Sequence, residues 1–243
     1  MGGPELVLVA AIFLVASVVQ AVTGFGFSLV AVPLLALIIG PVPAVVAATT
    51  ASMVISVAVV RDDWHFIRWR ATTIFTVAGI VGMPLGLYVI NQVSARTLTG
   101  LIAVAMLVST VLVATGATLK STAVTDSAVG VTSGIMLTST GLNGPPLVVS
   151  MQAMQMAPRP FRGTLSAVFL GQGVVAIALL ATAGRVTDQA GIAALIAVPM
   201  LVAGWLIGNR VFHRIDPVVF RRVVLVMLFV TALVALGQAL LGG

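Results

Sequence analysis

Ten apolar runs separated by short loops occupy almost the whole chain. Of its 243 residues, 60% are hydrophobic and 7% are charged, and the mean hydropathy is +1.22. Runs of this length suit the hydrocarbon core of a bilayer rather than a water-soluble core. The pattern predicts an all-α integral membrane protein with one transmembrane domain over residues 1–243. The predicted segments are residues 5–22, 27–40, 44–60, 71–90, 97–116, 124–139, 145–157, 161–182, 190–211 and 218–241.

Two glycine-rich breaks interrupt these runs. The first is Thr23-Gly24-Phe25-Gly26-Phe27-Ser28, and the second is Thr140-Gly141-Leu142-Asn143-Gly144-Pro145-Pro146. Breaks at corresponding places in two halves of a membrane protein are typical of a transporter's binding site. The alternative is that small residues merely allow helices to pack closely.

An internal repeat connects the breaks. Gly24 and Gly141 lie 117 positions apart, as do Thr23 with Thr140 and Pro43 with Pro160. Gly82 and Gly86 match Gly204 and Gly208 at a spacing of 122. The order of these matches favours a duplication, with about five helical segments in each repeat. We place the first repeat at about residues 5–116 and the second at about 122–243.

Basic residues predict how the repeats are oriented. If the runs on either side of each break count as two segments, ten basic residues fall on one side of the membrane, against Arg96 and Arg185 on the other. By the positive-inside rule the richer side is cytoplasmic, so both termini face outside. The second repeat is then inverted relative to the first. Re-entrant hairpins and tilted full crossings at the breaks both satisfy this count.

A new helix is expected after each break. Asn143 is a suitable N-cap, and Pro145 fits the first turn, where its missing N–H costs nothing. Helix N-termini carry free N–H donors and a partial positive charge, which favour an anion. Gly26 lets the backbone approach a ligand closely, and Ser28 adds a hydroxyl.

Polar side chains on neighbouring segments extend the candidate site. Thr49 shares a helical face with other small polar residues, and Ser166 shares one with Arg162. These faces either line a substrate path or form hydrogen bonds between helices. Gln20 either faces a cavity or caps a backbone carbonyl. Arg162 is either an interfacial anchor or an attractor of the anion.

Several functional classes lack the residues they need. The chain has no cysteine, and its two histidines lie in loops, so we expect neither a metal site nor catalysis. All six acidic residues fall in loops or at segment ends, so we expect no buried carboxylate that would indicate a proton relay, and only Asp126 and Glu5 lie close enough to the interface to leave a relay open. The basic residues lie in short loops between apolar runs, a topology signal rather than a nucleic-acid surface. We expect a multi-pass protein of the cell membrane, without cofactors, in contact with the lipid bilayer and compatible with a homo-oligomer.

Three stretches resemble a known family. They are Gly-Phe-Gly-Phe-Ser-Leu-Val-Ala-Val-Pro at 24–33, Gly-Leu-Asn-Gly-Pro-Pro-Leu-Val at 141–148, and Phe161-Arg162-Gly163-Thr164. Together they resemble the sulfite exporter TauE/SafE family, also called the toluene sulfonate uptake permease family. The resemblance covers nearly the whole chain. It implies a bacterial or archaeal inner-membrane transporter of small organosulfur, sulfite-like or carboxylate anions. The chain departs from the more symmetric members at 143–146, where they keep a glycine run.

The expected function is secondary transport of a small anion such as a sulfonate or sulfite, as an exporter working by alternating access. The alternatives are an anion channel and a carboxylate transporter of the same fold. A membrane-embedded enzyme would need a nucleophile and a base at membrane depth, and the chain has no histidine there. The predicted substrate-binding residues are Thr23, Gly24, Phe25, Gly26, Phe27, Ser28, Thr140, Gly141, Asn143, Gly144, Pro145, Thr49, Ser166, Arg162 and Gln20.

Overall fold

The computed structural model describes residues 3–115 and 120–214, and beyond them only positions 216, 218, 219, 222 and 226. The described residues form α-helices joined by short connections, with one 3₁₀ turn, η1 (Trp64–Phe66). This confirms the all-helical prediction. Most of the predicted segment 218–241 lies outside the described residues. The helices are α1 (Gly3–Thr23), α2 (Phe27–Ile39), α3 (Pro41–Asp63), α4 (Trp69–Gln92), α5 (Ala95–Ala114), α6 (Ala123–Thr140), α7 (Gly144–Ala153), α8 (Pro158–Thr182) and α9 (Asp188–Phe212).

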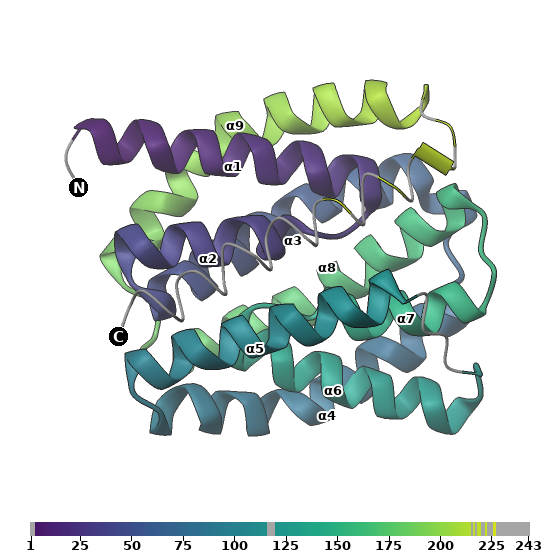
Figure 1. Ribbon diagram of the computed structural model, residues 1–243, viewed down its shortest axis with the longest axis horizontal. Coiled ribbons are helices and arrows are strands. Elements are labelled where there is room, and N and C mark those ends of the chain that lie inside the picture. The colour runs from purple at the N-terminus through teal and green to yellow at the C-terminus, as the bar shows by residue number, and fades with distance from the viewer. Residues whose placement is uncertain are drawn as a thin grey trace.

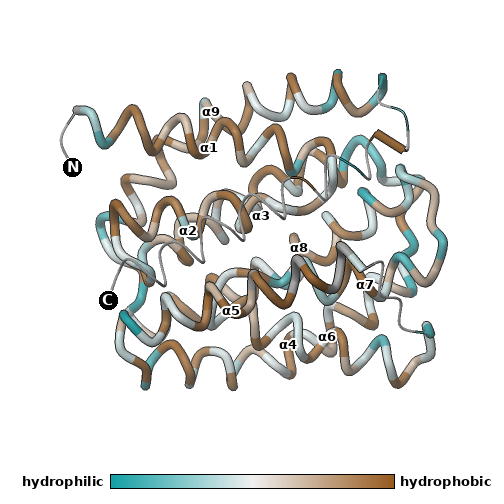
Figure 2. Tube along the Cα trace, in the orientation of Figure 1, coloured by the Kyte–Doolittle hydropathy of each residue, from teal (hydrophilic) through white to brown (hydrophobic). Residues whose placement is uncertain are grey.

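The helices lie side by side in a bundle. Figure 1 shows α1 and α9 along one side, α4 and α6 along the opposite side, and α3 and α8 between them. In Figure 2 the hydrophilic residues gather towards the two ends of the bundle, and hydrophobic residues fill the length between. Among the described residues, five helices are long and apolar enough to cross a membrane: α1, α3, α4, α8 and α9. The chain is a multi-pass membrane protein.

Apolar side chains on the outside of the bundle fit a lipid environment. On α4, Val77, Val81, Leu85 and Tyr88 are all exposed and recur at the helical period. An exposed stripe of this kind would be costly in water and is favourable against acyl chains. The opposite face of α4 carries buried glycines instead, which bring it close to α6.

Two contacts between repeats copy each other. On α9, a Cβ at Gly204 would press on the carbonyl oxygen of Leu14 in α1. On α4, a Cβ at Gly82 would overlap the carbonyl oxygen of Val131 in α6. Leu14 and Val131 are separated by 117 positions, the spacing of the two breaks. α9 therefore packs on α1 through the same kind of contact by which α4 packs on α6.

The next turn of each pair repeats the arrangement. A Cβ at Gly208 would press on the carbonyl of Val18, and one at Gly86 would overlap the carbonyl of Ile135. Val18 and Ile135 are again 117 positions apart. Glycine is needed here because the helix backbones touch, which is how small residues bring membrane helices together.

Left-handed glycines end the first helix of each repeat. Gly24 has a φ of 80° and Gly26 a φ of 93°, while Gly141 has a φ of 76°. L-residues with a side chain rarely adopt such values, so these positions turn the chain where glycine allows it. The helices that follow are short, with 13 residues in α2 and 10 in α7. At a rise of about 1.5 Å per residue neither is long enough to cross the hydrocarbon core alone.

Candidate functional site

A small cavity lies between the two breaks. Its volume is about 10 Å³, room for roughly one water molecule. Residues of both breaks and of helices α3 and α8 form its wall. The lining residues are Gly26, Phe27, Ser28, Leu29, Ser52, Leu142, Asn143, Gly144 and Phe169. The breaks, more than a hundred residues apart in the chain, therefore lie close together in space.

Several residues in the wall of the cavity lie 117 positions apart, the spacing of the two breaks. Gly26 corresponds to Asn143 at the spacing of 117, and Phe27 corresponds to Gly144. A third pair, Ser52 on α3 and Phe169 on α8, keeps the same spacing. The two copies of one local structure thus face a common space.

The start of α2 presents unused backbone donors to this cavity. Gly26 is the N-cap and provides no side-chain cap. The first amide of the helix to bond a carbonyl belongs to Val30, which donates to Gly26 at 3.1 Å. The N–H groups of Phe27, Ser28 and Leu29 therefore have no partner among the described residues, as expected for a first turn without a cap. All three residues line the cavity.

The start of α7 differs from the prediction at Asn143. This residue occupies the N-cap position, but its side chain caps nothing. A cap accepts from the second or third amide of the helix, and those positions are Pro145 and Pro146, which have no N–H. The prediction that the Asn143 side chain caps the helix is therefore wrong, because neither proline has an N–H to donate. Gly144 supplies the single first-turn amide of α7, and it lines the cavity.

Asn143 instead joins a buried amide network. Its Nδ2 donates to Oε1 of Gln172 at 3.0 Å, and its backbone carbonyl accepts from the Ser133 hydroxyl at 3.1 Å. Gln172 in turn donates to the carbonyl of Phe75 at 3.0 Å. These bonds connect the start of α7 to α6, α8 and α4. Asn143 thus fixes the position of the second break.

The threonine hydroxyls of the breaks donate to backbone carbonyls of the helices that carry them. Thr23 donates to the carbonyl of Val19 at 2.8 Å and accepts from the amide of Phe25 at 3.2 Å. Thr140 donates to the carbonyl of Met136 at 2.9 Å. Neither residue lines the cavity. Both hydroxyls therefore stabilise the ends of α1 and α6, beside the breaks.

Gln20 ties α1 to α3. Its Nε2 donates to the Ser56 hydroxyl at 2.9 Å and to the Ser52 carbonyl at 3.1 Å. Its Oε1 accepts from the Ser52 hydroxyl at 2.9 Å. Of the two roles considered for Gln20, the structure shows the second: its side chain binds a backbone carbonyl, that of Ser52 on α3. It stands directly behind the wall of the cavity, because Ser52 belongs to that wall.

The remaining predicted residues pack around the breaks. A Cβ at Gly24 would lie 2.7 Å from the Cα of Arg162, and one at Gly141 would lie 3.2 Å from Val32. The Phe25 ring meets the edge of Phe161 with centroids 6.5 Å apart. Pro145 does not line this cavity but a separate groove between α4, α5, α6 and α7.

Among the buried hydroxyls that have no hydrogen-bond partner in the described residues, two lie near the cavity. They are Thr49 Oγ1 on α3, 3% exposed, and Ser166 Oγ on α8, fully buried. These positions are also 117 apart, and each lies one turn before a cavity residue, Ser52 or Phe169. An unmet buried hydroxyl costs about 1–3 kcal/mol, so its occurrence in both repeats is unusual.

Arg162 is neither an interfacial anchor nor a lining residue of the cavity. Its side chain is fully buried, and its Nε lies 2.6 Å from Oδ2 of Asp63. Its Nη1 donates to the Ala21 carbonyl at 3.0 Å and to Oδ1 of Asn209 at 3.1 Å. The guanidinium lies 3.7 Å above the Phe212 ring. Arg162 therefore joins α1, α3, α8 and α9.

The expectation that no carboxylate is buried is wrong. Asp63 is fully buried, and besides Arg162 it binds Arg159, whose Nε lies 2.9 Å from its Oδ1. Asp126 is 7% exposed and accepts from the hydroxyls of Ser150 and Ser121, both at 2.8 Å. Loss of hydropathy predicted the end of the third segment at residue 60, whereas α3 continues to Asp63. Within the described residues no three histidine, aspartate or glutamate side chains are grouped as metal ligands.

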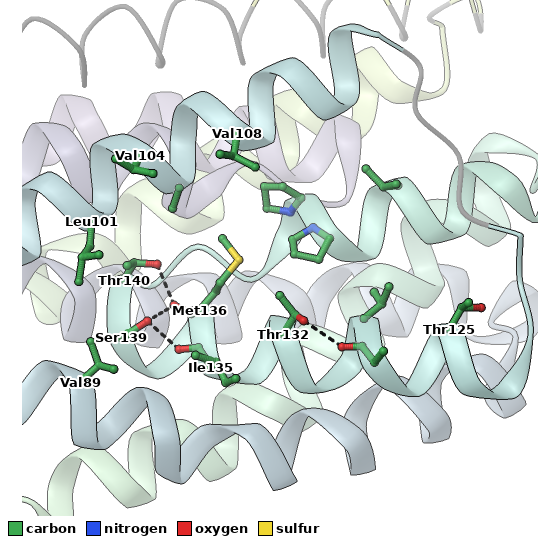
Figure 3. Close-up of a pocket in the computed structure, with 16 residues that line it drawn as sticks. Val89, Leu101, Val104, Val108, Thr125, Thr132, Ile135, Met136, Ser139 and Thr140 are labelled. Atoms are coloured by element: carbon green, nitrogen blue, oxygen red, sulfur yellow. Dashed lines mark hydrogen bonds between the residues drawn. The ribbon is translucent and has the colours of Figure 1, made fainter.

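A second, larger space is an apolar groove of about 760 Å³ between α4, α5, α6 and α7 (Figure 3). Pro145 and Pro146 form part of its wall. Its hydroxyls already donate to carbonyls of the chain: Thr132 to Ala128, Ser139 to Ile135, Thr140 to Met136, and Thr125 to Lys120. The groove therefore offers an anion no free hydroxyl, and its chemistry suits hydrocarbon.

Comparison with known proteins places the chain in a family. The family model described as sulfite exporter TauE/SafE matches residues 8–235. A protein of Cupriavidus necator, named "Probable sulfite/organosulfonate exporter TauE", is 27% identical over 212 residues, which cover 84% of this chain and 83% of that protein. No solved structure matches the chain. With this match over most of its length, the chain belongs to the sulfite exporter TauE/SafE family, whose members are membrane transporters and not enzymes.

Proposed function

We propose that the protein is a secondary transporter of the cell membrane that exports sulfite or a small organosulfonate by alternating access. The anion binds in the cavity between the two breaks. Membership of the family and the name of the Cupriavidus relative support the substrate class. The described helices that can cross a membrane support the location.

The observation that carries the site is the pair of unpartnered hydroxyls on Thr49 and Ser166. They stand one turn from a cavity that unused first-turn amides of α2 and α7 also line. An oxyanion that leaves water must exchange its hydration for donors in the site. Donors of this kind carry no full charge, so they bind an anion more weakly than a buried cation would. A carrier needs that balance, because it must also release its cargo.

Arg162 has a different role in this proposal. Its Nε pairs with Asp63, which also pairs with Arg159, and its Nη1 binds Ala21 and Asn209, while its Nη2 is buried without a partner among the described residues. It packs against Gly24 and so holds the first break in place. We assign it to positioning of the break rather than to direct contact with the anion.

The size of the cavity supports a closed conformation. A sulfonate group has a sulfur atom and three oxygens, whereas the cavity has room for about one water molecule. Binding must therefore separate the breaks from α3 and α8. The matched contacts of α9 with α1 and of α4 with α6 support two inverted repeats that move relative to each other, as in transporters with broken helices.

Reconstitution into liposomes tests the proposed function. Purified protein is tested with labelled sulfite, a short alkanesulfonate and the carboxylate of the same chain length. We expect saturable uptake of sulfite or the sulfonate that an excess of the unlabelled anion inhibits. Unitary currents without saturation would instead identify a channel. Saturable uptake of the carboxylate alone would identify the carboxylate transporter.

A further inference from the structure

A third space lies at the surface, between α3, α4 and α8. It is an open groove of about 420 Å³. The first two turns of α4 form one wall, from Trp69 to Val77, and α8 forms the other from Ala167 to Gly171. It shares no residue with the cavity at the breaks. The proposed transport function therefore does not explain it.

The walls of this groove suit a hydrocarbon chain. Two of its hydroxyls donate to the helix that carries them: Thr72 to the Arg68 carbonyl at 3.3 Å, and Thr73 to the Trp69 carbonyl at 3.0 Å. The third, Thr76 Oγ1, is buried and has no partner among the described residues. The groove thus combines apolar walls with one unused hydroxyl, which suits an acyl chain that carries an ester oxygen.

Two tryptophans stand at one end of the groove. Trp64 and Trp69 meet edge to face with ring centroids 4.5 Å apart, and their exposed fractions are 52% and 43%. Tryptophan concentrates at the boundary between acyl chains and headgroups, because its ring is apolar and its N–H is polar. This end of the groove therefore lies at headgroup level.

The same end carries an excess of positive charge. Arg61 follows the lining residue Val60, and Arg68 and Arg70 flank the lining residue Trp69. All three arginines are exposed, and within the described part of the chain none makes an ion pair with a carboxylate. The charge count assigns this end to the cytoplasmic side, where basic sites between membrane helices bind anionic headgroups.

We propose that this groove is a binding site for an anionic phospholipid. One acyl chain lies between α4 and α8, and the headgroup phosphate contacts Arg68 and Arg70. Charge complementarity selects an anionic lipid over a zwitterionic one, because the amine of a zwitterionic headgroup would meet unpaired arginines. The lining residues of this groove and of the apolar groove of Figure 3 are all uncharged, but the charged residue next to the lining of the latter is Asp126, beside Thr125, so it offers no selection for an anion.

Native mass spectrometry of the detergent-purified protein tests the headgroup. Phosphatidylglycerol and phosphatidylcholine with identical chains are added in equal amounts, and bound lipid is counted. We expect preferential binding of phosphatidylglycerol. The double variant Arg68→Gln/Arg70→Gln should bind it roughly thirty-fold more weakly, at about five-fold per arginine. Arg96→Gln, on α5, is the matched control and should change nothing.

A second pair of variants tests the acyl chain. Val77 is exposed and lines the groove, and Val81 is exposed one turn further along α4, outside it. Val77→Trp should fill the groove and lower retention of phosphatidylglycerol, while Val81→Trp should retain it. Melting temperatures without added lipid show that each variant is folded.

Three results would overturn the proposal. The first is equal retention of the two lipids by the wild-type protein. The second is unchanged phosphatidylglycerol binding in the folded double arginine variant or in the folded Val77→Trp variant. The third is a rise in melting temperature with inorganic phosphate alone that matches the rise with phosphatidylglycerol, because the ligand would then be a free anion.

Discussion

Asp63 forms ion pairs with two arginines, one of them fully buried. A buried ion pair gains from its attraction about what it loses in hydration, so its main effect appears when one partner is removed. Both side chains of the Asp63–Arg162 pair are almost inaccessible to solvent, and the pair joins positions 99 residues apart. At the scale of the residue, this pair fixes the first break against α8.

Asp63→Asn should therefore destabilise the protein strongly, by about 3–5 kcal/mol, because it leaves Arg162 charged and buried without its counterion. Unfolding in detergent measures this effect. Arg159→Gln is the control, because Arg159 is 42% exposed and Asp63 keeps Arg162 as a partner, so the loss of stability should be smaller. Equal losses in the two variants would contradict the assigned role of the buried pair.

Local rules predict part of the candidate site. Glycine at positions 24 and 141 allows the left-handed turns found there, and two prolines after Gly144 favour the start of α7 at that residue. The partners of Arg162 could not be predicted, because Asp63 and Asn209 come from other helices. The sequence also shows a hydroxyl at Thr140, but it does not show that this hydroxyl already donates to the carbonyl of Met136 one turn earlier.

At the scale of the element, two helix pairs are held by backbone contact. On α9, Gly204 touches the backbone of α1, whereas Gly191 on the same helix has open space at its Cβ position. Hydropathy predicted the approximate bounds of these helices, because apolar length is a property of the chain. Which helices pair could not be read from it, because all of them are similarly apolar. For the pairing of the helices, the sequence offered one signal: the equal spacing of Gly82 and Gly86 from Gly204 and Gly208.

Gly204→Ala should destabilise the protein by about 1–3 kcal/mol, because the added methyl group would separate α9 from α1. Gly191→Ala on the same helix should stabilise it by about 0.5–1 kcal/mol, because alanine favours helix more than glycine does. Thermal unfolding of the two variants in one detergent makes the comparison. If Gly204→Ala were as stable as Gly191→Ala, the close contact between α1 and α9 would be refuted.

At the scale of the whole molecule, the two breaks share one cavity, and α9 packs on α1 as α4 packs on α6. The charge count adds an orientation: the loop before α4 on the cytoplasmic side and the loop before α5 outside. Ser94 and His65 lie in these loops and are exposed. The orientation stays a prediction from the sequence. The matched breaks also predicted a common site, and in the structure residues of both breaks line one cavity together with Ser52 on α3 and Phe169 on α8.

Labelling of single cysteines checks this orientation. The protein has no native cysteine, so Ser94→Cys and His65→Cys each add one reporter to a silent background. A membrane-impermeant maleimide applied to intact cells should label Ser94→Cys and leave His65→Cys unlabelled until the cells are opened. The reverse pattern would invert the topology.

The most direct measurement of the central claim compares Thr49→Val, Ser166→Ala and the control Thr50→Val in anion transport and in thermal unfolding. Thr50 is next to Thr49, but its hydroxyl donates to the Val46 carbonyl at 2.9 Å. Thr49→Val and Ser166→Ala each remove an unmet buried hydroxyl, so stability should hold or rise. Affinity for the transported sulfite or sulfonate should fall by about 1–3 kcal/mol, the cost of a lost polar partner. Thr50→Val should transport with unchanged affinity. If Thr49→Val and Ser166→Ala kept the affinity of the wild-type protein, the anion would not bind between the breaks.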